Sequence, residues 1–191
     1  MYKHTSKAND DSITCFHFIC TMKTIGLIGG LTWVSTIEYY KLINQMVNQR
    51  LGGSASAQLV MYSVNFNTIQ QFTEAGNWDG IAGILIDAAK KLENAGADCL
   101  LIGANTMHHV YDKIQADVNI PLIHIAETTS KAISEKGLKK ILLLGTKYTM
   151  QMDFFTNKLT ENGIEPMLPN AEEIEFINTA IYTQLGKNFS A

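Results

Sequence analysis

The sequence has 191 residues, of which 46% are hydrophobic and 17% are charged, and its formal net charge is −3. This balance is typical of a folded globular protein and excludes a long disordered chain. Acidic and basic residues are interspersed without a basic patch, so we expect no nucleic-acid partner. No apolar run reaches the about 18 residues of a membrane-spanning helix, so we expect no membrane partner.

Three cysteines are present, Cys15, Cys20 and Cys99. An odd number without a repeated spacing does not indicate a disulfide framework, and it favours a reducing, cytoplasmic location. Cys15 and Cys20 flank His17, but two thiols and one imidazole leave a tetrahedral metal site without its fourth ligand. We therefore predict no bound metal.

Residues 1–21 differ from the rest of the chain. They begin with polar residues and end in a short apolar cluster at 13–20, without the basic start, long apolar stretch and cleavage site of a signal peptide. Met22 directly precedes the first apolar run. We predict that residues 1–21 are a disordered extension and that the folded part begins at residue 22.

The first part of the chain alternates apolar runs with helical patterns. Residues 23–30 predict a buried strand that ends in a glycine turn, and Ser35 or Thr36 can cap a helix that ends near Arg50. The next expected elements are a strand at 58–64, a polar loop at 65–76, a helix at 78–96, a strand at 98–103, a helix at 106–116 and a short strand at 120–125.

The second part echoes the first, because residues 139–146 have the same basic start, apolar stretch and glycine turn as residues 23–30. Its expected elements are helices at 127–136, 150–162 and 171–185 and strands at 139–146 and 164–168. Strands that alternate with helices predict an α/β fold with mainly parallel sheets. We expect two similar Rossmann-like domains at 22–125 and 126–191. The second lacks a third strand, so it is either truncated or completed by a partner.

The carboxyl end of the strand predicted at 98–103 is the expected centre of a small-molecule site. An apolar run stops there, and Asn105 and Thr106 follow, where ligands bind in open α/β sheets. The turn at Gly29 and Gly30 can direct backbone amides toward a carboxylate or phosphate. A nucleotide-binding module is the alternative, but the glycines lack the G-x-G-x-x-G spacing and no acidic residue ends the second strand.

Three segments resemble the aspartate/glutamate racemase family: residues 22–36 (MKTIGLIGGLTWVST), 104–108 (ANTMH) and 120–125 (IPLIHI). These are amino-acid racemases that do not use pyridoxal phosphate. The resemblance extends to about residue 185. It implies two similar α/β domains with an amino-acid substrate between them, no cofactor, and a homodimer.

The resemblance also implies a reaction in which two cysteines, one per domain, remove and return the proton on opposite faces of Cα. A free thiol has a pKa of about 8.5 and can serve as either base or acid once tuned. The first cysteine would stand at Ala104, and the second would lie in a Gly-Cys-Thr-Glu turn beyond Ala191. Cys99 lies roughly 16 Å along the strand from Ala104, so we do not expect it to substitute. The alternative is an inactive or truncated member that at most binds small carboxylates.

The resemblance assigns substrate-binding residues from both domains: Gly30, Leu31, Gln70, Asn105, Thr106, Thr146 and Thr149. Asn105 and Thr106 match the family's carboxylate contacts, and Gln70 falls where some members have an arginine for a side-chain carboxylate. Three histidines are expected to pack or hydrogen-bond near helix and strand ends rather than to act as acids or bases: His108, His109 and His124.

Overall fold

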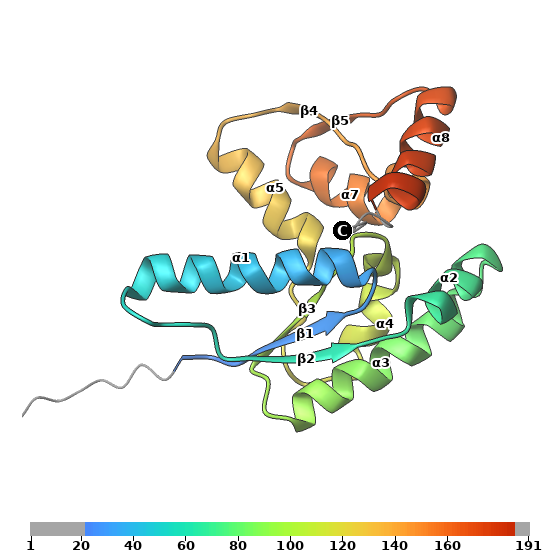
Figure 1. The fold of residues 1–191 in the computed structure, drawn as a ribbon. Helices are drawn as coiled ribbons and strands as arrows, with labels where there is room; N and C mark the ends of the chain where they lie inside the picture. Colours follow the sequence, from blue (N-terminus) through green and yellow to red (C-terminus); the bar gives the residue numbers. More distant parts are fainter. Residues whose placement is uncertain (1–21, 186–191) are drawn as a thin grey trace, which may run out of the picture.

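The structure is a computed structural model, and it describes residues 22–185 (Figure 1). The extension expected at 1–21 lies outside the described residues. The described strands are β1 (Ile25–Gly29), β2 (Leu59–Ser63), β3 (Cys99–Ile102), β4 (Lys140–Leu142) and β5 (Glu165–Met167). The helices are α1 (Trp33–Leu51), α2 (Phe66–Glu74), α3 (Trp78–Asn94), η1 (Thr106–Val110), α4 (Tyr111–Gln115), α5 (Ile125–Glu135), α6 (Lys147–Gln151), α7 (Asp153–Glu161), α8 (Ala171–Ala180) and η2 (Ile181–Leu185).

The paired strands among the described residues all run parallel, and helices alternate with them along the chain. This confirms the predicted α/β class. The first sheet has the order β2-β1-β3, and the second pairs β4 with β5. Figure 1 shows α1 and α3 on opposite faces of the three-stranded sheet. We call the elements up to α4 the N-terminal half and those from α5 onward the C-terminal half. None of the helices between residues 22 and 185 is both long and apolar enough to cross a membrane.

Each half has its own hydrophobic cluster. In the N-terminal half, α3 buries one face at helical spacing against the sheet, through Ile81, Ala82, Leu85, Ala88, Ala89 and Leu92. In the C-terminal half, the buried cluster is Ala126, Leu143, Phe155, Leu159 and Ile164. Because the two clusters are separate, contacts between the halves come from the residues around the strand ends.

The predicted loop at 65–76 is wrong, because most of it forms α2. Asn65 caps this helix by accepting a hydrogen bond from the backbone N–H of Asn67, and Gly76 follows its end with φ +65°. Ile69 and Thr73 lie one turn apart and are buried, while the residues between them are mostly exposed. Two buried positions are too few to stand out among the polar residues of this segment.

Three further elements differ in detail between the sequence-based prediction and the structure. The cap of α1 is Thr32, whose hydroxyl accepts from the N–H of Ser35. The strand expected at 120–125 is reduced to a single bridge between Leu100 and Leu122, because α5 begins at Ile125. The helix expected at 150–162 is split into α6 and α7, since extended backbone at Met152 interrupts it.

Candidate active site

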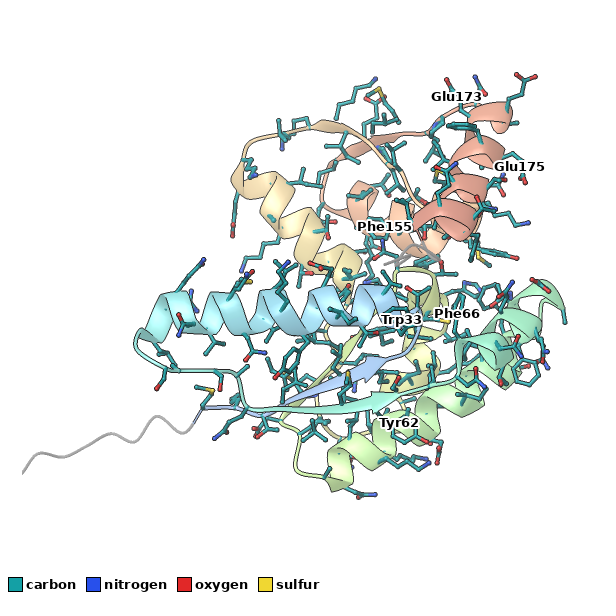
Figure 2. All side chains as sticks on the ribbon, viewed as in Figure 1. Trp33, Tyr62, Phe66, Phe155, Glu173 and Glu175 are labelled. Atoms are coloured by element: carbon teal, nitrogen blue, oxygen red, sulfur yellow. The ribbon has the colours of Figure 1, made fainter. Side chains whose placement is uncertain are left out.

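A cavity of about 300 Å³ lies between the two halves, beside the carboxyl ends of the first sheet. This volume is at the lower end of ligand pockets. Its walls from the N-terminal half include Leu31, Thr32, Phe66, Gln70, Glu74, Ala104 and Thr106, and those from the C-terminal half are Lys147, Tyr148, Asn178 and Tyr182. Figure 2 shows Phe66 in the region where the two halves meet.

The cavity collects part of the predicted binding set. Leu31, Gln70 and Thr106 line it, and Ala104 lines it at the expected proton-transfer position. Asn105, by contrast, is exposed and is not among the lining residues. The turn after β3 therefore brings Thr106, rather than Asn105, to the cavity.

The two predicted threonines of the C-terminal half, Thr146 and Thr149, contact Thr106 but are not among the residues that line the cavity. The hydroxyl oxygen of Thr106 is 2.9 Å from that of Thr146 and 3.5 Å from that of Thr149. Thr146 also caps α6, because its hydroxyl accepts from the N–H of Thr149. Three hydroxyl groups thus meet where the halves touch, and they hold the start of α6 against the turn that follows β3.

Gly30 shapes the wall of the cavity through its backbone. Its φ is +77°, and a Cβ atom there would lie 2.2 Å from the carbonyl oxygen of Val64. Its N–H donates to the hydroxyl of Thr36 at 2.9 Å, so this amide is already occupied within the fold. Gly30 allows a tight turn that brings Leu31 and Thr32 to the cavity.

Four lining residues of the C-terminal half were not predicted from the sequence. Lys147 and Tyr148 occupy the first turn of α6, and the buried amide oxygen of Asn178 accepts from the backbone N–H of Lys147 at 3.0 Å. Burial raises the pKa of Tyr182, and the neighbouring Tyr148 and Glu74 raise it further. The echo between residues 23–30 and 139–146 could have indicated Lys147, since it follows the second glycine turn.

Aromatic contacts join the halves beside the cavity. The ring of Trp78 lies edge-on to the rings of His109 and Tyr148, with centroids 4.5 and 5.7 Å away. The ring of His109 in turn contacts Phe154 of α7 at 6.0 Å. The exposed side chain of His109 therefore contacts elements of both halves.

His108 is buried beneath the turn that carries Ala104. Its Nδ1 lies 3.0 Å from the carbonyl oxygen of Ala104, and since a carbonyl only accepts, Nδ1 carries the proton. Burial, together with the neighbouring ring of His124, whose centroid lies 5.0 Å away, lowers the pKa of His108 to about 4. The imidazole Nε2 is buried without a hydrogen-bond partner among the described residues. His108 is thus a neutral packing residue at physiological pH.

Cys99 and metal-binding groups lie apart from the cavity. Cys99 begins β3 and pairs in register with Ile25, at the opposite end of the strand from Ala104. Burial raises the pKa of its thiol, and the charge of Asp98 raises it further. Among residues 22–185, no group of three or more His, Cys, Asp or Glu side chains is placed to hold a metal ion.

Comparison with known proteins identifies the class to which this fold and site belong. The sequence profile of the Asp/Glu/hydantoin racemase family matches residues 28–190. The chain therefore belongs to this family.

Individual relatives agree with this assignment. A candidate Asp/Glu racemase from Yersinia pestis has 45% sequence identity and a TM-score of 0.81, and an aspartate racemase homologue from Pyrococcus horikoshii has 42% and 0.76. Each comparison covers 86% of this chain and 72% of the other. The broad specificity amino-acid racemase RacX from Bacillus subtilis is 38% identical over 87 residues. That alignment spans 46% of this chain and 38% of RacX.

Proposed function

We propose that the protein is an amino-acid racemase of the aspartate/glutamate type, which moves the Cα proton without a cofactor. The observation that carries the proposal is the cavity between the halves, which unites Leu31 and Thr106 with Lys147 and Tyr148. Racemisation requires access to both faces of Cα, and a pocket whose walls come from two α/β units suits this requirement. Family membership supports the same reaction class.

We propose that the substrate carboxylate binds at the turn of Asn105 and Thr106. Thr106 lines the cavity, and its hydroxyl lies within reach of the hydroxyls of Thr146 and Thr149. Hydroxyl donors held in this way can stabilise the negative charge that develops when Cα loses its proton. Leu31 and Gln70, which line the cavity, belong to the same proposed binding set. Gly30 contributes to it through the turn that brings Leu31 and Thr32 to the cavity.

The finer organisation is also a proposal. We assign residues 22–125 and 126–191 to two α/β domains, and a cytoplasmic homodimer to the assembled protein. Among residues 22–185, no further strand pairs with either edge of the β4–β5 sheet. Leu142 of β4 and Leu144, which follows it, are 54% exposed. Unpaired edges and exposed apolar side chains support a second domain that needs a further strand or a partner copy to cover it.

A second function has one observation in its favour. Ala104 lines the cavity where the family resemblance calls for a proton-transfer side chain, and a methyl group can neither take nor give a proton. Cys99 lies at the other end of β3. On these grounds the alternative is a family member that binds small carboxylates without turning them over.

Exchange of the Cα proton with solvent separates the two functions. We would incubate the protein in D2O with L- and D-aspartate and L- and D-glutamate, and follow the Cα signal by proton NMR. Signal loss above the rate in buffer is the result expected of a racemase. If calorimetry shows binding of these amino acids but no Cα exchange occurs, the binding-only function replaces the racemase. If neither binding nor exchange is observed, both proposed functions are overturned.

A further inference from the structure

The cavity contains two fully charged side chains of opposite sign among its described lining residues, Glu74 and Lys147. Glu74 is the last residue of α2 in the N-terminal half, and Lys147 is the first residue of α6 in the C-terminal half. No ion pair within residues 22–185 joins them to each other. An anion and a cation thus belong to the walls of one pocket without neutralising each other.

The carboxylate of Glu74 is held by its own helix. The side-chain Nε2 of Gln70, one turn earlier, donates to its Oε1 at 2.9 Å. This contact uses one oxygen of the carboxylate and leaves the other able to accept from a ligand. Gln70 and Glu74 are exposed residues that both line the cavity, so the pair adds a negative charge to its wall. The raised pKa of Tyr182, to which Glu74 contributes, reflects the same charge at the C-terminal wall.

Lys147 belongs to the wall that the C-terminal half contributes. The residue is half-buried, and its Nζ lies 5.3 Å from the ring centroid of Tyr148, another lining residue. Its backbone is fixed by the hydrogen bond from its N–H to Asn178. Within the part of the chain that the structure describes, no carboxylate forms an ion pair with this ammonium. It therefore remains available to an anionic ligand.

We propose that Glu74 and Lys147 make this cavity selective for zwitterions, with Glu74 contacting the α-ammonium group and Lys147 a carboxylate of the ligand. The inference rests on the proposed function and adds the residues that distinguish an α-amino acid from a plain carboxylic acid. Glu74 is the specificity-determining residue, because a carboxylate wall attracts an ammonium and repels an anion that lacks one. A hydrogen bond to a charged group corresponds to roughly tenfold to hundredfold in affinity.

Aspartate and succinate form the matched pair of ligands that tests this proposal, because they differ only in the ammonium group. Isothermal titration calorimetry of the whole chain should give tighter binding of aspartate. The Glu74→Gln variant should bind aspartate at least about tenfold more weakly and succinate as well as before or better. The Lys147→Met variant should bind both ligands more weakly, since both carry carboxylates.

A control of the same chemistry is available on α8. Glu175 is exposed and does not line the cavity, and Figure 2 shows it on the outer side of that helix. Glu175→Gln should leave both affinities unchanged, which separates a local effect from a change in net charge. Thermal unfolding of every variant checks that the fold is retained, and Glu74→Ala serves as a second variant if Glu74→Gln is poorly folded.

Two results would overturn the proposal while leaving the racemase assignment intact. One is equal affinity of the unmodified protein for aspartate and succinate, together with Cα exchange. The other is that the Glu74→Gln variant loses affinity for aspartate and for succinate by the same factor. Failure of the protein to bind or exchange any amino acid would instead remove the proposed function itself, and the zwitterion site with it.

Discussion

The hydroxyl oxygens of Thr106 and Thr146 lie 2.9 Å apart, although the two residues are separated by 40 positions in the chain. Thr106 ends the turn after β3, and Thr146 caps α6, so this contact joins the carboxyl end of the first sheet to the helix that carries Lys147 and Tyr148. The geometry of the cavity therefore depends on how well the halves are held together at this point.

The contact between these threonines can be measured by a double-mutant cycle. Thr106→Val and Thr146→Val remove each hydroxyl at nearly constant side-chain shape. Thr146→Val should cost about 1 kcal/mol more than the contact itself because it also removes the cap of α6. The coupling energy from urea unfolding of the two single variants and the double variant should be roughly 0.5–1.5 kcal/mol. Strict additivity would show that the hydroxyls do not interact.

Gly30→Ala should destabilise the protein by about 2 kcal/mol or more, because a Cβ atom there meets both a positive φ and the Val64 carbonyl. Gly53 is the matched control, since its φ is also positive, at +57°, but a Cβ atom added there would meet nothing within 4 Å. Gly53→Ala should cost only about 1 kcal/mol. If denaturant unfolding shows the same loss of unfolding free energy for both variants, the close contact between the added Cβ atom and the Val64 carbonyl does not contribute to stability.

Acid should weaken the fold through His108. Its pKa is about 4 in the folded protein and 6.5 as its ordinary value, so the unfolded chain binds more protons between these pH values. The stabilisation is fully present above pH 6.5 and is lost as the pH falls toward 4, by about 3 kcal/mol at about 1.4 kcal/mol per pKa unit. Burial also lowers the pKa of His124, which adds in the same direction.

Urea unfolding across this pH range gives the measurement. His108→Gln keeps a polar side chain but no titrating group, and it should flatten the dependence of unfolding free energy on pH. A variant whose stability falls with acid as steeply as that of the unmodified protein would assign the effect to other groups.

Ala104→Cys should place a reactive thiol in the cavity wall. Iodoacetamide labelling, followed by peptide mass spectrometry, should modify the introduced thiol faster than Cys99, whose pKa is raised by burial. Aspartate should slow labelling of the introduced thiol and leave that of Cys99 unchanged. Equal protection of the two positions, or of neither, would contradict the assignment of the ligand to this cavity.

The sequence predicts the central strands well because their apolar runs are bounded by clear signals. β1 and β3 are followed by glycine and small polar residues, and α3 has a continuous buried stripe. The segment at 65–76 has no comparable buried stripe, since α2 buries only Ile69 and Thr73. Local patterns cannot identify a helix whose apolar face is so narrow.

The candidate site is predicted less completely, for a different reason. Thr106 and Leu31 follow recognisable strand ends, whereas Asn178 and Tyr182 line the cavity because of the way the two halves meet. That arrangement depends on contacts such as the one between Trp78 and Tyr148, which join residues far apart in the sequence. The spacing of residues along the chain does not predict these long-range contacts.

The contrast between α1 and α3 has a consequence for local stability. Thr36 is the one buried residue among the 19 residues of α1, while α3 buries six. A helix held by so little tertiary packing opens more readily than one that forms the core. The backbone amides of α1 should exchange with deuterium well before those of α3, and their protection factors should rise when a second chain or a further segment covers this face.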